Sequence, residues 1–118
     1  ETGMFRLVID KAGIPCNYLE TSGSSLLAYA VLKGVRLGYL PKRFRAYGEK
    51  AFYGTCDKYL GVNDKGELQL SGICLVAGLG GATRRDGSLE YYFSEPVVEN
   101  AAQGVAPLLL AYTEMIIQ

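Results

Sequence analysis

The hydrophobic residues of this chain gather in two long runs, and both runs predict helices that are buried on every side. Residues 26–32 are almost entirely apolar, and residues 105–117 are apolar apart from a proline and one Thr-Glu pair. Apolar residues on all faces of a helix indicate burial all round rather than on one stripe. We therefore predict one helix over residues 24–40, ended by Pro41, and another over residues 104–117.

A different pattern separates these two runs. Residues 42–60 place apolar side chains at spacings of three and four, with charged residues opposite, which predicts a helix buried on one face and capped at Gly61. Residues 67–71 alternate as a half-buried strand, and residues 89–93 follow a turn signal as a second short strand. Residues 4–9 are apolar enough to form a strand or an extended lead-in.

Two helices that need burial on every side cannot both be covered by one amphipathic helix and a hairpin. Apolar surface left in water costs about 25 cal/mol per Å², so an uncovered helix face costs several kcal/mol. Typical total stabilities are about 5–15 kcal/mol. We expect the missing cover to come from more of the same polypeptide or from another subunit, with self-association through the exposed helix faces as one form of it.

Composition narrows the classes of function. With 118 residues the chain is one domain at most, and 12 basic residues balance 12 acidic ones to a net charge of zero. That balance removes the main electrostatic reason to expect nucleic acid or an anionic membrane as partner. The sequence shows no signal peptide and no membrane-spanning run, so we expect a cytoplasmic rather than a secreted protein.

The chain contains no histidine and three cysteines, Cys16, Cys56 and Cys74. This excludes histidine-based zinc sites and Ser-His or Cys-His catalysis within these residues. An odd number of widely spaced cysteines also argues against a disulfide framework. We expect the thiols to behave as small buried hydrophobes and predict no metal site.

A polar turn over residues 17–25 stands directly before the first apolar helix, and Glu20, Thr21 and Ser22 are its candidate functional residues. Polar groups at the start of a buried helix either cap the free N–H groups of its first turn or bind a ligand. We favour capping for Glu20, with binding of sugar hydroxyls as the alternative.

A second candidate is the glycine-rich loop formed by Gly78, Leu79, Gly80 and Gly81. A dinucleotide-binding loop would need a third glycine where the chain has Thr83, followed by a helix. We therefore expect a loop in which the backbone closely approaches a neighbouring segment or a ligand.

Three other side chains have possible roles. Tyr91 and Tyr92 have the aromatic face and polar tip that suit stacking on a sugar ring, but alternation along a strand would place at most one of them in a site. Glu114 lies in a helix expected to be buried, where a carboxylate requires a partner, and we predict a structural ion pair.

Five blocks of the sequence, taken in order, carry a family resemblance. They are NYLETSGS (17–24), KGVRLGYL (33–40), GICLVAGLGG (72–81), DGSLEYYFSEP (86–96) and GVAPLLLA (104–111). Together they resemble the C-terminal third of the unsaturated rhamnogalacturonyl hydrolases of glycoside hydrolase family 105, which are related to the unsaturated glucuronyl hydrolases of family 88.

The resemblance implies a mainly helical fold, in which residues 1–118 form the C-terminal portion of a single (α/α)6-barrel domain. Residues 24–40 would be an inner helix, 42–60 an outer helix and 104–117 the last inner helix, with a small β-hairpin at the end of the barrel. The implied activity removes a 4,5-unsaturated uronic acid from pectin-derived oligosaccharides by hydrating its double bond. No metal or organic cofactor is implied.

The resemblance also limits which site residues are expected here. The family's catalytic aspartates precede the matched part, and no aspartate of this chain matches their motifs, so we expect no catalytic residue and no activity from the chain alone. Substrate contacts are expected from Glu20, Thr21 and Ser22 and from the loop of residues 78–81. The Asn-Asp pair common before the last helix is Asn100-Ala101 here.

Two other interpretations remain open from the sequence. One is a noncatalytic helical module that associates with itself through its apolar faces. The other is an enzyme of the family 88 type that acts on unsaturated glucuronyl rather than galacturonyl sugars.

Overall fold

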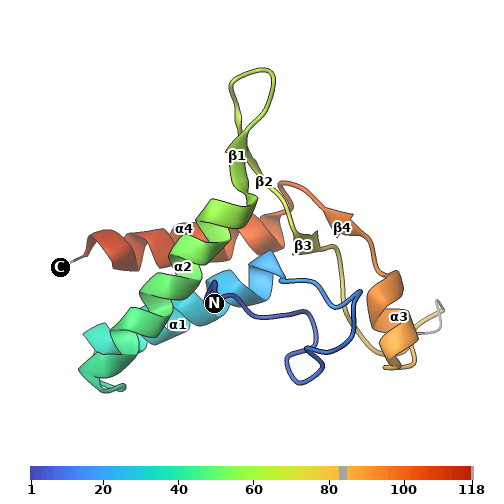
Figure 1. The fold of residues 1–118 in the computed structure, drawn as a ribbon, viewed down its shortest axis with the longest axis horizontal. Coiled ribbons are helices and arrows are strands. Elements are labelled where there is room, and N and C mark those ends of the chain that lie inside the picture. The colour runs from blue at the N-terminus through green and yellow to red at the C-terminus, as the bar shows by residue number, and fades with distance from the viewer. Residues whose placement is uncertain (83–84, 118) are drawn as a thin grey trace.

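The first long helix packs against both of the other long helices, and Figure 1 shows the three together. In the computed structural model, which describes residues 1–82 and 85–117, these helices are α1 (Thr21–Arg36), α2 (Arg45–Tyr59) and α4 (Ala102–Ile116). Direct contact between α2 and α4 is much more limited than the contact of either with α1. Thr83, where a dinucleotide loop would need glycine, lies outside the described residues.

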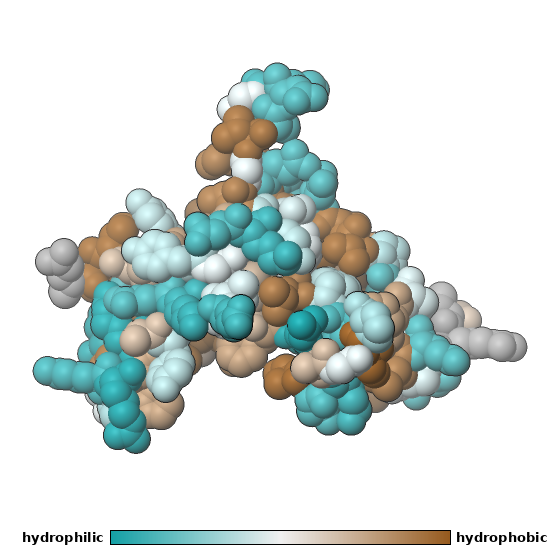
Figure 2. Space-filling model, in the orientation of Figure 1, coloured by the Kyte–Doolittle hydropathy of each residue, from teal (hydrophilic) through white to brown (hydrophobic). Residues whose placement is uncertain are grey.

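The short elements connect and extend this layer of helices. A 3₁₀ turn, η1 (Lys42–Phe44), leads into α2, and the chain passes from α2 straight into β1 (Leu60–Val62), which pairs antiparallel with β2 (Leu68–Leu70). This hairpin projects from the helices, and Figure 2 shows a hydrophilic tip above a hydrophobic base. Gly61 is therefore a strand residue, and the prediction that it caps the helix is wrong.

A second antiparallel pair holds the start of α4 near the start of α1. β3 (Ile73–Cys74) pairs with β4 (Val97–Val98), in the register Ile73↔Val98. Between these strands the chain forms a short helix, α3 (Leu89–Ser94), so the prediction of a strand over residues 89–93 is wrong. The reason is the cap: the Ser88 hydroxyl accepts a hydrogen bond from the Tyr91 N–H at 3.1 Å and nucleates a helix.

α1 ends earlier than predicted because a glycine stops it before the proline does. Gly38 adopts a φ of +79°, which glycine tolerates without steric cost. The Tyr39 N–H donates to the Gly34 carbonyl at 2.8 Å and the Gly38 N–H to the Val35 carbonyl at 3.1 Å. These two bonds form a Schellman cap, which ends the helix at Arg36 and leaves the residues before Pro41 outside it.

The other predicted elements shift by smaller amounts. α4 begins two residues before the predicted start and ends at Ile116, with Pro107 inside it. Residues 4–9 form an extended lead-in with a single bridge between Arg6 and Leu19 rather than a strand. Cys16 is exposed, so the expectation that all three thiols are buried is wrong for it, whereas Cys74 is buried.

Small residues let α1 and α2 approach closely. The α1 face that packs inward consists of Ser24, Ser25, Ala28 and Leu32. On α2, a side chain at Gly48 would come within 2.8 Å of Leu32. The buried stripe of α2 therefore runs through Gly48. Tyr47 is one of the apolar residues whose spacing over residues 42–60 predicted a buried face, and it is exposed.

The outer surfaces of the apolar helices stay uncovered. Leu26 on α1 and Leu109 on α4 are 52% and 59% exposed. Their companions on the same two helices, also exposed, are Leu27, Leu110, Tyr112 and Ile116. Within the described residues, both helices that are apolar all round therefore bury only one face. This agrees with the expectation that one amphipathic helix and a hairpin cannot cover both of them.

Candidate functional site

Glu20 is the N-cap of α1, and its carboxylate also binds a strand distant in sequence. Oε1 accepts the Ser22 N–H at 3.0 Å and Oε2 accepts the Gly23 N–H at 2.6 Å, which satisfies two free donors of the first turn. Oε1 also accepts the backbone N–H of Cys74 at 3.0 Å. The carboxylate therefore joins the start of α1 to β3, and only 5% of the residue is exposed.

The two predicted neighbours of Glu20 differ in exposure. Thr21 is fully buried, and its hydroxyl donates to the Ser71 carbonyl at 2.6 Å, so it holds the helix start against the chain before β3. Ser22 is half-buried, and its hydroxyl donates to Glu20 Oε1 at 2.8 Å. Of this pair, Ser22 is the one that a ligand can reach.

An open pocket lies beside this helix start. Glu20, Ser22 and Gly23 form one side of it. The residues that complete the lining come from the N-terminal segment, from the chain that follows β3, from α3 and from α4, and they are Leu7, Cys74, Leu75, Val76, Ala77, Tyr92 and Gln103. Hydroxyl, amide and aromatic groups along one apolar wall are the mixture that suits a sugar, whose ring has polar edges and apolar faces.

Two of these lining residues come from helices that follow β3 in the chain. Tyr92 is exposed to the pocket from α3, and Gln103 stands in the first turn of α4. The Gln103 amide donates to the Leu75 carbonyl at 2.8 Å, which fixes the chain after β3 against α4. Gln103 is missing from the residues chosen on sequence, where it is an isolated amide without a motif around it.

The glycine-rich loop lies next to the pocket without lining it. Ala77 is the last lining residue on this stretch, and Gly78 follows it. Gly80 and Gly81 adopt φ values of +76° and +80°, and the Gly80 N–H donates to the Arg85 carbonyl at 2.7 Å. Leu79 is highly exposed, and its side chain lies beside Gly87. The structure therefore brings Glu20 and Ser22 together at the pocket and leaves residues 78–81 at its edge.

Tyr91 does not line the pocket, and its hydroxyl instead binds the residues at this edge. Its hydroxyl donates to Glu95 Oε1 at 2.7 Å and accepts the Gly78 N–H at 3.2 Å. Burial and the bond to Glu95 raise the pKa of the Tyr91 hydroxyl. Of the two adjacent tyrosines only Tyr92 lines the pocket, and a helix rather than the expected strand alternation separates them. The expectation that at most one of them belongs to a site stays a prediction.

The pocket holds no poised acid or base among the described residues. Its one lining carboxylate, Glu20, accepts four hydrogen bonds from within the chain. Burial raises the pKa of the Cys74 thiol, which keeps it protonated at neutral pH. The polar groups that the described residues present to this pocket are therefore a hydroxyl, an amide and a phenol rather than a free acid or base.

Two further findings concern the described residues only. Across residues 1–82 and 85–117, acidic and cysteine side chains nowhere gather in threes at a distance suited to a metal ion. Over the same residues, each helix is too short or too polar to cross a membrane.

The sequence matches the model of Glycosyl Hydrolase Family 88 over residues 1–118. The chain belongs to this family. Two curated relatives of the family 88 chain are Protein Atu3128 of Agrobacterium fabrum and a 24.9 kDa protein in the picA locus of Rhizobium radiobacter. Each is 40% identical over 123 residues, which cover 99% of this chain and 53% of the relative. The chain thus spans about half the length of these relatives.

Solved structures confirm the fold of the family 88 chain. A glycoside hydrolase of family 105 from C. acetobutylicum superposes with a TM-score of 0.89 at 46% identity, over 94% of this chain and 31% of that one. A possible family 105 member from Salmonella enterica gives a TM-score of 0.74 at 29% identity, over 98% and 26% of the two chains. The prediction of a helical segment of the family 105 and family 88 type is confirmed.

Proposed function

We propose that this chain supplies one wall of the substrate pocket in an unsaturated rhamnogalacturonyl hydrolase. Its substrate would be a pectin-derived oligosaccharide that ends in a 4,5-unsaturated uronic acid. The family match over residues 1–118 supports a glycoside hydrolase as the parent enzyme. The observation that carries the proposal is the pocket at the start of α1, which offers sugar-binding chemistry and no available acid.

The lining of that pocket indicates which catalytic roles belong to this chain and which belong to residues outside it. Hydration of the double bond needs a group that donates a proton to the unsaturated sugar and activates water, and the product hemiketal then rearranges and releases the sugar. Glu20 is already occupied by four hydrogen bonds, so we assign the proton transfer to aspartates outside these 118 residues. The roles left for this chain are stacking by Tyr92 and a hydroxyl contact from Ser22.

The test is hydrolysis of unsaturated disaccharides, followed as loss of absorbance of the conjugated uronate. We expect turnover by the native polypeptide that contains these residues and none by the 118-residue chain alone. Tyr92→Ala in the native polypeptide should raise KM with a smaller effect on kcat, while Tyr47→Ala, which removes an exposed tyrosine of α2 outside the pocket lining, should leave both unchanged. Turnover by the isolated chain would show that the reacting acid lies within it, against this proposal.

The same assay separates the two sugar specificities. An unsaturated galacturonyl-rhamnose disaccharide from pectin and an unsaturated glucuronyl disaccharide from a glycosaminoglycan carry the same 4,5-unsaturated uronate, because the double bond removes the C4 stereocentre that distinguishes the parent sugars. They differ in the sugar that leaves. We expect the pectin-derived compound to have the higher kcat/KM. A clear preference for the glucuronyl compound would instead favour an enzyme of the unsaturated glucuronyl hydrolase type.

A noncatalytic helical module is the second candidate function, and the exposed aliphatic residues of α1 and α4 favour it. In that case the chain should form a stable homo-oligomer, and no polypeptide that contains it should turn over unsaturated disaccharides. Mass measurement in solution together with the disaccharide assay distinguishes the two candidates.

A further inference from the structure

Leu7 is the residue that the N-terminal segment contributes to the lining of the pocket beside the start of α1. It is half-buried, so part of its side chain stays accessible. Tyr92 and Ser22 line the same pocket from α3 and α1. Ligand pockets combine apolar walls with a few polar groups, and an aliphatic wall can pack on the apolar face of a sugar ring. The position of Leu7 therefore bears on how this pocket binds.

The backbone on both sides of the Leu7 side chain is attached to the turn that precedes α1. The Leu7 N–H donates to the Tyr18 carbonyl at 3.0 Å, beside the antiparallel bridge of this segment. The N–H of the next residue, Val8, donates to Oδ1 of Asn17 at 3.0 Å. Two successive residues of the segment are thus held by two successive residues of the turn, and Leu7 is one of them.

Asn17 binds this segment with its whole side-chain amide. Besides the bond that Oδ1 accepts, Nδ2 donates to the Val8 carbonyl at 2.7 Å and to the Lys11 carbonyl at 2.9 Å. An asparagine amide has two N–H donors and one oxygen acceptor, so these bonds use both donors and the oxygen. The residue is fully buried. A buried polar group satisfied in this way rigidifies the backbone that it binds.

We propose that Leu7 packs on an apolar face of the bound sugar, and that Asn17 is a positioning residue that acts on the substrate through Leu7. Asn17 does not line the pocket itself. The sugar contact rests on the proposed function for the identity of the ligand, whereas the attachment of Leu7 to the turn does not. An asparagine that served only the stability of the fold would leave substrate affinity unchanged when replaced.

The kinetic test uses the native polypeptide that contains these residues, with an unsaturated galacturonyl-rhamnose disaccharide as the probe. Leu7→Ala removes most of the apolar contact and should raise KM about fivefold, with kcat changed by less than about twofold. Asn17→Ala should raise KM similarly, because it releases Leu7. In the double variant KM should rise no further than in the more affected single variant, because two residues that act through one contact are not additive.

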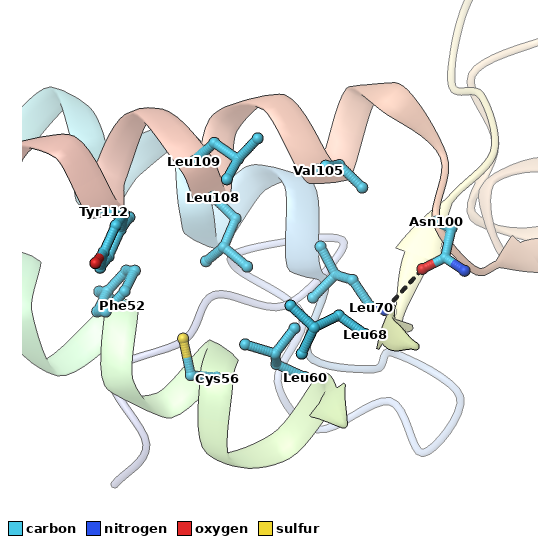
Figure 3. A pocket seen from close by; sticks show the side chains of 10 residues that line it. All are labelled: Phe52, Cys56, Leu60, Leu68, Leu70, Asn100, Val105, Leu108, Leu109 and Tyr112. Atoms are coloured by element: carbon cyan, nitrogen blue, oxygen red, sulfur yellow. Dashed lines mark hydrogen bonds between the residues drawn. The ribbon is translucent and has the colours of Figure 1, made fainter. Parts of the chain in front are cut away.

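Asn100→Gly is the matched control for a lost asparagine side chain. Asn100 Oδ1 accepts the Leu70 N–H at 2.8 Å, as the dashed line in Figure 3 marks. Asn100 lines a groove between α2, the β1–β2 hairpin and α4, and it does not line the pocket beside the start of α1. This control should therefore lower stability and leave KM unchanged, provided that each variant is assayed well below its Tm.

Hydrogen exchange of the native polypeptide, followed by mass spectrometry on peptides that cover residues 5–9, tests the attachment without substrate. Asn17→Ala should accelerate exchange of the Leu7 and Val8 amides about tenfold or more, because the Val8 N–H loses its acceptor. Asn100→Gly should leave this exchange unchanged. If Asn17→Ala does not fold, Asn17→Asp is the second variant, since it keeps the acceptor and loses both donors, and it should accelerate exchange by a smaller factor.

Four results would overturn the inference. Leu7→Ala without an effect on KM would remove the sugar contact, and unchanged exchange at residues 7 and 8 would show that Asn17 does not hold Leu7. A lower Tm with unchanged KM for Asn17→Ala would leave it a structural role alone. Effects on KM that multiply in the double variant would show that Asn17 acts by another route.

Absence of turnover by the unmodified polypeptide is a separate result. It would contradict the proposed function, and the contact between Leu7 and the sugar would fall with it. The exchange experiment would still decide whether Asn17 holds Leu7, because it involves no substrate. Failure of the positioning role and failure of the proposed function are therefore distinguishable.

Discussion

Arg36 and Glu114 join α1 to α4 through two parallel hydrogen bonds. Arg36 Nε donates to Glu114 Oε2 at 2.6 Å, and Nη2 donates to Oε1 at 2.8 Å. The Glu114 side chain is 4% exposed and that of Arg36 is 35% exposed, so the carboxylate depends on this fork for its partners. The prediction that Glu114 is a paired structural carboxylate is confirmed.

This pair should make stability depend on acid pH. The hydrogen bond from Arg36 lowers the pKa of Glu114 below its ordinary value of 4.5. A carboxyl whose folded pKa is depressed stabilises the fold fully above its unfolded pKa and loses that contribution as the pH falls through the folded pKa. Glu114→Gln should therefore lower Tm by several degrees near neutral pH, and the gap to the unmodified chain should narrow below about pH 4.5.

Thermal unfolding between pH 7 and pH 3 measures this gap. Glu49→Gln is the matched control, because it removes an exposed ion pair with Arg45 one turn away on α2. Exposed pairs of this kind contribute about 0.3–0.5 kcal/mol, so the control should change Tm very little. A gap for Glu114→Gln that stays constant down to pH 3 would contradict the assigned direction of the pKa shift.

Gly104 should not tolerate a side chain. A Cβ at this position would lie 2.5 Å from Cδ1 of Ile73, which is fully buried and cannot move aside. Gly104→Ala should destabilise the chain by about 1–3 kcal/mol through overpacking. Gly13→Ala is the control, because a Cβ there meets nothing within 4 Å. Urea unfolding of both variants measures the difference, and we expect the lower midpoint for Gly104→Ala. Equal midpoints would contradict the expected crowding at Ile73.

Asn100 should be needed both for its side chain and for its backbone conformation. It adopts a φ of 55°, its N–H donates to the Leu70 carbonyl at 2.8 Å, and its Oδ1 accepts the Leu70 N–H at 2.8 Å. Asn100→Gly keeps the conformation and loses one bond, which costs about 0.5–1.5 kcal/mol, while Asn100→Ala adds about 1–2 kcal/mol of backbone strain. The order of unfolding midpoints should be Asn, Gly, Ala, and an alanine variant more stable than the glycine variant would contradict it.

The sequence predicts the helices of this fold well and their ends poorly, because the two depend on different information. Residue periodicity locates α1, α2 and α4. Their ends are set by single contacts, such as the bonds of Tyr39 and Gly38 that stop α1 before Pro41. The residues of α3 have the aromatic content of a strand, and one cap from Ser88 makes them helical.

The candidate site shows the same limit. Glu20 and Ser22 are found from sequence because a polar turn before an apolar helix is visible locally. Cys74 and Gln103 line the same pocket although they lie more than 50 residues away in the sequence, and no local sequence pattern predicts that they are close to Glu20 and Ser22. Which residues share a pocket depends on how β3 pairs with β4, a long-range contact that periodicity does not encode.

Glu20 allows a direct choice between capping and sugar binding. Its carboxylate accepts the N–H groups of Ser22, Gly23 and Cys74, and the last of these is buried with it. Glu20→Ala leaves these donors without their acceptor and should cost about 1–3 kcal/mol. Ser22→Ala, which removes one hydroxyl donor and no acceptor of a backbone N–H, should cost much less.

In the native polypeptide, a carboxylate that only caps should affect stability and leave substrate affinity nearly unchanged. We therefore expect Glu20→Ala to lower Tm while KM for an unsaturated disaccharide, measured well below that Tm, stays within about threefold, a change of less than about 1 kcal/mol. A tenfold rise in KM with an unchanged Tm would mean that the carboxylate binds sugar hydroxyls. The capping hydrogen bonds would then be the arrangement that orients Glu20 for a ligand, and the pocket would contain a charged contact as well as Tyr92.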